Sequence, residues 1–281
     1  MLRKMEFFPP LDADCAACDW HSQEKTLDVD VSLGYTAEVG GGTMIIFDEQ
    51  RLSDSPFVER IWRCHSEGAH PFLSIAESRC ELVVSRFYGK TTMTVRGPET
   101  KATSLGDCPA DGEWLGIRLK PGTFLSQLFA CKLVDTALTL PQATSKSFWL
   151  GGSAWQFPDY ENADTFVDWL VREGLLVREP IVGEALQGHL KDLSLRSVQR
   201  RFLLATGVTQ KTVRQIERAR YATLLLQQGV SISDTIEQAG YFDQPHLTRS
   251  LKYFIGQTPA QILHQSGTEQ LSFLYKTSPF C

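Results

Sequence analysis

The chain has 281 residues, of which 42% are apolar and 22% are charged, and its formal net charge is -5. This apolar content is enough to bury the cores of one or two domains, and it excludes an intrinsically disordered chain. No segment approaches the roughly 18 apolar residues that a membrane helix needs, and Glu6 precedes any run that could form a signal peptide. The seven cysteines are too sparse and irregular for a disulfide framework. We therefore expect a soluble, cytoplasmic protein with no membrane partner.

Strand-like segments separated by turn residues fill the first two thirds of the chain. Each is a short run of β-branched and apolar residues, and Gly97-Pro98 and Pro121-Gly122 end two of them. The segments are residues 43–47, 80–84, 91–95 and 114–119. This pattern predicts an antiparallel β barrel or sandwich.

Helical patterns follow the strands. Residues 123–129 and 163–171 both place apolar side chains at helical spacing. We expect no strand beyond Arg172, and Gly and Pro residues that interrupt helix propagation favour a linker at 172–180.

Charge changes sign near the same place. Residues 1–180 contain 17 Lys and Arg against 26 Asp and Glu, a net charge of -9, whereas residues 181–265 contain 10 against 6, a net charge of +4. An acidic amino-terminal part and a basic carboxyl-terminal part suggest two functions. The sequence therefore predicts an α+β multidomain chain: a β-rich domain at 1–175, an all-α domain at 176–265 and a tail at 266–281.

A helix-turn-helix layout is visible at residues 182–207. Ser194 is a good N-cap, and the helix that it begins is expected to end at Gly207. Its buried stripe, spaced i, i+3, i+7, is expected to be Leu195, Val198 and Phe202. The opposite face carries Arg196, Gln199 and Arg200. Arg and Gln side chains match the hydrogen-bonding edges of guanine and adenine in the major groove.

A second copy of this layout follows about 50 residues later. A short helix around Ile232 ends at Gly240, Asp243 can cap the next helix, and Pro245 lies in that helix's first turn. The next helix, 244–254, is expected to bury Leu247, Leu251 and Phe254. A helix at 211–228 would join the two units, and its length of about 27 Å is close to the ~34 Å between successive major grooves. One chain could therefore place two helices in adjacent grooves.

These segments together resemble the DNA-binding domain of the AraC/XylS family of transcription regulators. The resemblance covers about residues 181–265 and rests on the motifs Ser194–Gly207, Arg218–Leu225, Ser233–Gln244 and Leu247–Pro259. It implies a seven-helix, sequence-specific DNA-binding domain. The positions that match the family's base-reading positions are Arg196, Gln199, Arg200, Gln244, His246 and Arg249. Lys252 is a further candidate for DNA contact, at a phosphate, with a solvated or helix-pairing role as the equal alternative. Pro245 departs from the pattern because it removes a side-chain donor from the second unit.

Residues 45–150 are similar to a cupin-like sensor domain that is found fused to AraC-type domains. The likeness is carried mainly by Gly, Pro and apolar positions, and it implies a β barrel with a pocket for a small-molecule effector. The side chains expected to line that pocket are Trp62, Tyr88, Trp114 and Arg118. Aromatic residues in a small barrel are, however, more often ordinary core than pocket lining. The implied partners are double-stranded DNA, the effector, RNA polymerase and a second copy of the chain.

A metal or redox function is the alternative for the β-rich domain. Cys15 and Cys18 have the spacing of a chelating pair, and His21 could add a third ligand, but no second half-site is evident. No nucleophile elbow, zinc-protease motif, P-loop or dinucleotide-binding motif occurs in the chain. We therefore expect a regulator that is not an enzyme and needs no cofactor.

Overall fold

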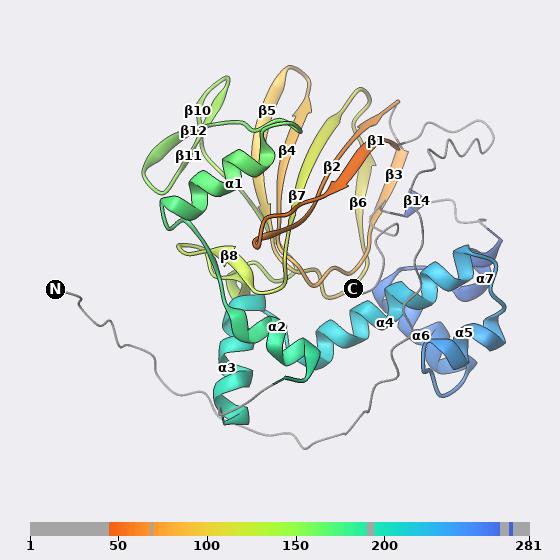
Figure 1. Cartoon of the computed structure of the whole chain (residues 1–281). Coiled ribbons are helices and arrows are strands. Elements are labelled where there is room, and N and C mark those ends of the chain that lie inside the picture. The colour runs from red at the N-terminus through yellow and green to blue at the C-terminus, as the bar shows by residue number, and fades with distance from the viewer. Residues whose placement is uncertain (1–44, 68–69, 190–193, 265–269, 272–281) are drawn as a thin grey trace. The chain divides into compact units, whose positions relative to one another are not determined.

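The largest element of the fold is a six-stranded antiparallel sheet. The computed structural model describes residues 45–67, 70–189, 194–264 and 270–271 of the chain. In spatial order, the strands of the sheet are β1 (Ile45–Leu52), β2 (Val58–Ser66), β7 (Glu113–Leu119), β4 (Glu81–Phe87), β5 (Lys90–Arg96) and β9 (Ala137–Thr139) (Figure 1). Every neighbouring pair is antiparallel. In the described residues, the four segments predicted as strands overlap β1, β4, β5 and β7, which confirms a sheet-rich first region.

The described residues also form three smaller sheets. β3 (His70–Ser74) pairs with β6 (Thr103–Cys108) in antiparallel fashion and with β14 (Gln270–Leu271) in parallel. β10 (Gln142–Thr144), β11 (Ser147–Leu150) and β12 (Ser153–Gln156) form a meander. β8 (Thr123–Leu125) pairs with β13 (Leu176–Arg178).

The β8–β13 pair corrects two sequence-based predictions. The helix predicted at 123–129 is wrong, since its first three residues form β8. The expectation of no strand beyond Arg172 is also wrong, because β13 lies within the predicted linker. A three-residue strand is too short to show a periodic pattern. The position of β13 depends on Leu176, which is 1% exposed and packs in the core of the β-rich region.

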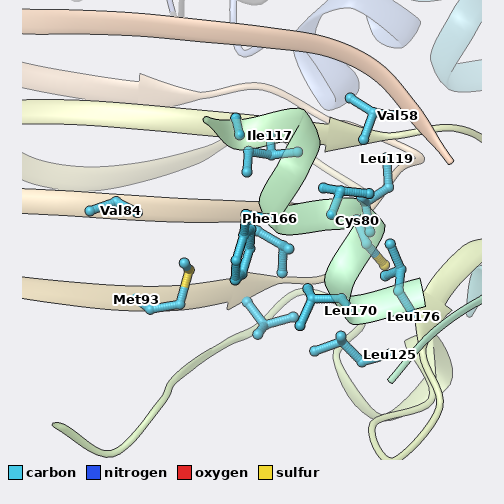
Figure 2. Close-up of a cluster of buried hydrophobic side chains, with 14 of the residues drawn as sticks. Val58, Cys80, Val84, Met93, Ile117, Leu119, Leu125, Phe166, Leu170 and Leu176 are labelled. Atoms are coloured by element: carbon cyan, nitrogen blue, oxygen red, sulfur yellow. The ribbon is translucent and has the colours of Figure 1, made fainter. Parts of the chain in front are cut away.

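One face of the large sheet packs against α1 (Ala163–Arg172), which confirms the helix predicted at 163–171. Phe166 and Leu170 lie one turn apart on α1, and both belong to the apolar cluster that includes Ile117 and Met93 of the strands. Figure 2 shows the Phe166 and Leu170 side chains projecting from α1 toward the sheet. Burial of side chains of this size contributes about 1.5–3 kcal/mol each.

The opposite face of the large sheet contains buried charge. Side chains alternate between faces along a strand, so Ile117 and Leu119 of β7 enter the apolar cluster, whereas Arg118 points the other way. Arg118 is 0% exposed, and its Nε donates to Glu81 Oε1 at 2.9 Å. A buried arginine requires such a partner.

The remaining described helices form the all-α region. They are α2 (Pro180–Gln187), α3 (Leu195–Thr206), α4 (Gln210–Gln227), α5 (Ile232–Gln238), α6 (Gln244–Phe254) and α7 (Pro259–Leu263). In the described part of residues 181–265 there are thus six helices, where the resemblance implies seven. A sheet-rich first region and a helical second region confirm the α+β layout (Figure 1). The exact boundaries at 175 and 265 stay predictions.

Local signals in the sequence place the ends of α3 and α6. The Ser194 side chain accepts from the Ser197 N–H at 3.2 Å, and Asp243 Oδ1 accepts from the His246 N–H at 2.7 Å, so both predicted N-caps are confirmed. Gly207 ends α3 with a φ of 74°, and a Cβ there would lie 2.8 Å from the Ala130 carbonyl oxygen. Only glycine fits this position without a shift of the backbone.

Leu195 is the exception in the predicted buried stripe. Val198 and Phe202 are 3% and 2% exposed, as expected, but Leu195 is 74% exposed, so its prediction as core is wrong. Leu195 is the first residue of α3, and the apolar cluster beneath the helix begins only at Val198.

Candidate nucleic-acid interface

The outer face of α3 is cationic. Arg196, Gln199 and Arg200 are all exposed, and their spacing of three and four residues places them on one side of the helix. The neighbouring Arg201 is turned back, because its Nη2 lies 2.7 Å from Glu179 Oε1. α3 contains no acidic residue. It therefore presents forked donors and an amide to solvent.

α6 also lacks acidic residues, but its predicted contact residues are arranged less uniformly. Gln244 and Arg249 are exposed. His246 is half-buried, with its ring edge-on to Tyr241 at a centroid distance of 5.1 Å. Lys252 is exposed near the carboxyl end, where its Nζ donates to the Gly256 carbonyl oxygen at 3.1 Å. Gln244, Arg249 and Lys252 are thus the exposed residues of this set, and His246 is not.

α4 joins the two units. It has 18 residues, which corresponds to about 27 Å, and it packs against α3 as well as α5, α6 and α7. Arg218 on α4 braces the turn before α6, since its guanidinium lies 4.4 Å from the centre of the Tyr241 ring and its Nη1 donates to the Gly240 carbonyl oxygen at 3.3 Å. The orientation of α6 therefore depends on α4.

The comparisons with known proteins agree with this geometry. Residues 192–265 match the family model described as a helix-turn-helix domain. Residues 192–265 are an AraC-type helix-turn-helix domain. No curated protein and no solved structure matches the chain. This domain supports an AraC-type DNA-binding transcription regulator, and the function of the β-rich region has to be argued from that region's own residues.

A buried ion-pair network joins the β-rich region to α4 of the AraC-type domain. Glu77, which follows β3, is 4% exposed, and its Oε2 lies 3.0 Å from Arg220 Nη1 and 3.6 Å from Arg118 Nη1. Burial alone would raise the pKa of the Glu77 carboxyl. The arginines around it, foremost Arg220 and then Arg118 and Arg79, outweigh burial and hold that pKa well below its usual range. Glu77 is therefore ionised and connects a β strand with a helix of the AraC-type domain.

Arg79 makes the second connection of the network. Its Nη1 lies 2.7 Å from Glu217 Oε1 on α4, and its Nε lies 2.5 Å from Glu59 on β2. Ser78 Oγ donates to the same Glu217 oxygen at 3.0 Å. These carboxylates hold the pKa of Arg79 well above its ordinary value against the opposing effect of burial. The side chains of Arg79 and Glu217 are 8% and 10% exposed, so solvent screens the pair only weakly.

Apolar contacts accompany the ion pairs. Ile75 and Ala76 are 0% exposed and belong to the same apolar cluster as residues of α4 and α6. The Ala76 N–H donates to the Phe254 carbonyl oxygen at 2.8 Å, and the Ala102 N–H donates to the Tyr253 carbonyl oxygen at 2.9 Å. The core beneath the second helix-turn-helix unit is thus completed by residues of the β-rich region.

The first helix-turn-helix unit also contacts the β-rich region. Phe124 of β8 and Val134 pack against the apolar cluster that contains Val198 and Phe202 of α3. α3 itself lies against the 3₁₀ turn Ala130–Lys132. Both units of the AraC-type domain therefore rest on the same β-rich region.

The structure does not bring the four predicted effector residues into one cavity. Trp62 is 3% exposed and covers Gly116, where a Cβ would lie 2.0 Å from the indole ring. Arg118 belongs to the ion-pair network, and Tyr88 is 83% exposed at the β4–β5 turn. Trp114 lines a cavity of about 240 Å³ together with Arg63, His65 and Tyr160, among others. Of the four, Trp114 is the one placed at this cavity.

A larger hollow lies elsewhere on the β-rich region. It has a volume of about 660 Å³, and α1 and the β11–β12 hairpin form most of its wall. Its apolar lining includes Trp155, Phe157, Phe166 and Trp169. None of these residues was predicted to line a pocket.

The ion-pair network was also missed by reasoning from the sequence. Glu77, Arg79 and Glu81 alternate with a period of two beside a buried strand, and Glu217 and Arg220 are three residues apart on a helix. These spacings are a signal that each group of charges shares a face. No spacing indicates that the two groups meet, because about 140 residues separate them.

The alternative of a metal or thiol site gains no support from the described residues. Within them, no group of three or more His, Cys, Asp or Glu side chains is arranged to hold a metal ion. Cys15, Cys18 and His21 lie outside the part of the chain that the structure describes. Burial, with smaller effects from Glu81 and Glu77, raises the pKa of the Cys80 thiol to about 12, so this cysteine is protonated and unreactive at neutral pH. None of the described helices is long and apolar enough to cross a bilayer.

Proposed function

We propose that this regulator reads a specific DNA sequence with α3 and α6 in successive major grooves. One observation carries the proposal. α3 and α6, which α4 joins, both have a capped amino-terminal end, contain no acidic residue and expose arginine side chains. Arg196 and Arg200 are suited to the O6 and N7 acceptors of guanine, and Gln199 to adenine. In the second unit, the residues at the corresponding positions of the motif are Gln244, His246 and Arg249, and their parts differ.

The residues of the second unit have distinct parts in this proposal. Gln244 and Arg249 are exposed and contact base edges, whereas the half-buried His246 positions the start of α6 through its contact with Tyr241. Lys252 lies eight residues after Gln244, about two helical turns further along α6, and contacts phosphate. Phosphate contacts fix the orientation of the protein on the duplex and do not read sequence.

The test begins with selection of a preferred duplex from a random pool by the full chain. Arg200→Ala should then weaken binding to that duplex by about 1–3 kcal/mol at fixed salt, because one bidentate base contact is lost. Arg201→Ala is the matched control, since the adjacent Arg201 is engaged with Glu179. Lys252→Ala should weaken binding to all duplexes alike and reduce the salt dependence by about one phosphate contact. Equal effects of Arg200→Ala and Arg201→Ala would contradict the assignment of α3.

The second part of the proposal is that the β-rich region binds a small-molecule effector and thereby controls DNA binding. Its support is that both helix-turn-helix units rest on this region and that Glu77 and Arg79 connect α4 with Arg118 and Glu59 of the sheet. A ligand in the cavity beside Trp114 would lie on β7, the strand that carries Arg118. Coupling of this kind is reciprocal, so DNA must also affect the β-rich region.

Reciprocity permits a test without knowledge of the effector. Hydrogen exchange of the full chain is measured with and without the selected duplex. We expect altered exchange in residues 74–80 and in β7 on binding DNA. Exchange that changes only in α3 and α6 would contradict control through the network. One equivalent of metal in the purified protein that is lost in Cys15→Ser would instead favour the metal- or thiol-dependent alternative.

A further inference from the structure

Two large apolar side chains are exposed beside the proposed base-reading residues. Phe242 is 90% exposed and Leu195 is 74% exposed, and they lie at the amino-terminal ends of α6 and α3. Phe242 immediately precedes the N-cap Asp243, and Leu195 immediately follows the N-cap Ser194. Exposure of such side chains forgoes the stabilisation that their burial would provide. Their shared position at the two helix starts indicates a common role.

The backbone around Phe242 is held on both sides. Tyr241 is 6% exposed, its hydroxyl lies 2.8 Å from Ser250 Oγ, and its ring lies under the Arg218 guanidinium. Asp243 on the other side caps α6. With both neighbours anchored, the Phe242 ring projects into solvent from a fixed point beside Gln244.

We propose that Phe242 and Leu195 are further specificity-determining residues, which contact the C5-methyl groups of thymines. The first residues of a recognition helix are those that reach base edges in the major groove. The thymine methyl is the apolar group that a base pair presents there. This inference rests on the proposed function, since it assumes that α3 and α6 enter the groove.

The surroundings of the two residues favour DNA over a protein partner. Arg196 follows Leu195 in α3, Gln244 begins α6 two residues after Phe242, and neither helix contains an acidic residue. The carboxylate of Asp243, next to Phe242, is engaged as the cap of α6. A cationic surface with single apolar side chains suits DNA, which presents phosphates together with apolar methyl groups. It suits a protein partner less well, because the core of a protein–protein interface is typically depleted of charged residues. Binding to a second copy or to another protein is an outcome that the experiment distinguishes.

The experiment removes the methyl groups one at a time. Each thymine of the selected duplex is replaced by uracil, and the affinity of the full chain is measured at fixed salt. We expect one thymine in each half of the site at which uracil weakens binding about fourfold, corresponding to ~0.8 kcal/mol for one buried methylene-sized group. For Phe242→Ala, uracil at the thymine of its half should have no further effect, while the other half keeps its full response. Leu195→Ala should show the reverse.

Controls separate this inference from the proposed function. Leu138→Ala alters an exposed apolar residue of β9 and should retain both uracil responses. A selected duplex whose thymines all tolerate uracil, or a Phe242→Ala variant that keeps both responses, would overturn the inference while leaving sequence reading intact. If Phe242→Ala changes only the sedimentation behaviour of the chain, the residue serves self-association and the inference is wrong. A pool that yields no preferred duplex would refute the proposed function itself.

Discussion

Replacing Arg220 by methionine should reveal how strongly the β-rich region is held to α4. Arg220 is 7% exposed, and its Nη1 lies 3.0 Å from Glu77 Oε2 and 3.1 Å from the Ala76 carbonyl oxygen. Removal of one partner from a buried ion pair costs about 3–5 kcal/mol, because the other charge is left in a medium of low polarity. Glu77 keeps Arg79 and Arg118 nearby, so we expect the lower end, about 3 kcal/mol at pH 7.

The stability lost in Arg220→Met should depend on pH, and the titration of Glu77 determines whether the loss grows or shrinks on acidification. Its pKa in the folded chain is held below that in the unfolded chain, so the stabilisation that it provides is complete above about pH 4.3 and declines as pH falls below that value. Arg220→Met removes the foremost cause of that lowered pKa. The variant should therefore lose less stability on acidification, and its difference from the wild type should shrink from pH 7 to pH 3.

Urea denaturation of the full chain measures these differences. In a double-mutant cycle with Glu77→Gln, we expect an interaction energy of more than 1 kcal/mol. Arg86→Met is the control, since Arg86 and Glu113 form an exposed pair at 3.8 Å whose loss should cost no more than about 0.5 kcal/mol. A cost below 0.5 kcal/mol for Arg220→Met, or additive effects of the two substitutions, would refute the argument that this network holds α4.

Three further outcomes follow from packing, capping and burial. Phe166→Ala should lower the free energy of unfolding by about 3–5 kcal/mol in urea denaturation, because a 5% exposed ring of the core is lost; a cost below 1 kcal/mol would show that α1 does not pack as described. Asp243→Ala should cost about 1 kcal/mol through loss of the α6 cap and should weaken binding to the selected duplex, whereas Asp243→Asn should retain most of both. At pH 8 a thiol reagent should modify the exposed Cys131 in the native chain and spare Cys80 until the chain is denatured, and equal rates by mass spectrometry would contradict the burial of Cys80.

Features that depend on neighbouring residues could be predicted from the sequence. The caps Ser194 and Asp243, the stop at Gly207 and the apolar spacing of α4 and α6 act within one or two helical turns. They were sufficient for the two helix-turn-helix units and for the exposure of Arg196, Gln199 and Arg200. Whether those side chains contact bases is a question for the duplex experiments.

The short strands β8 and β13 and the exposure of Leu195 could not be predicted from the sequence, because their cause is tertiary. β8 and β13 have three residues each and exist through pairing across about 50 residues of chain. Leu195 fits the apolar period of α3, but the cluster beneath the helix does not extend to its first residue. Apolar periodicity indicates which residues lie on the same face of a helix, but it does not indicate how far along the helix the surface packed against that face extends.

What the sequence by itself determined is the AraC-type domain, whose helices are specified by local caps, breakers and apolar periods. What only the tertiary structure decided is how that domain is supported. Ile75 and Ala76 complete its core, and Glu77 and Arg79 meet Arg220 and Glu217 from positions about 140 residues away. A buried charge is stable only where the fold supplies its counter-charge, and this pairing is a property of the folded chain that no local pattern encodes.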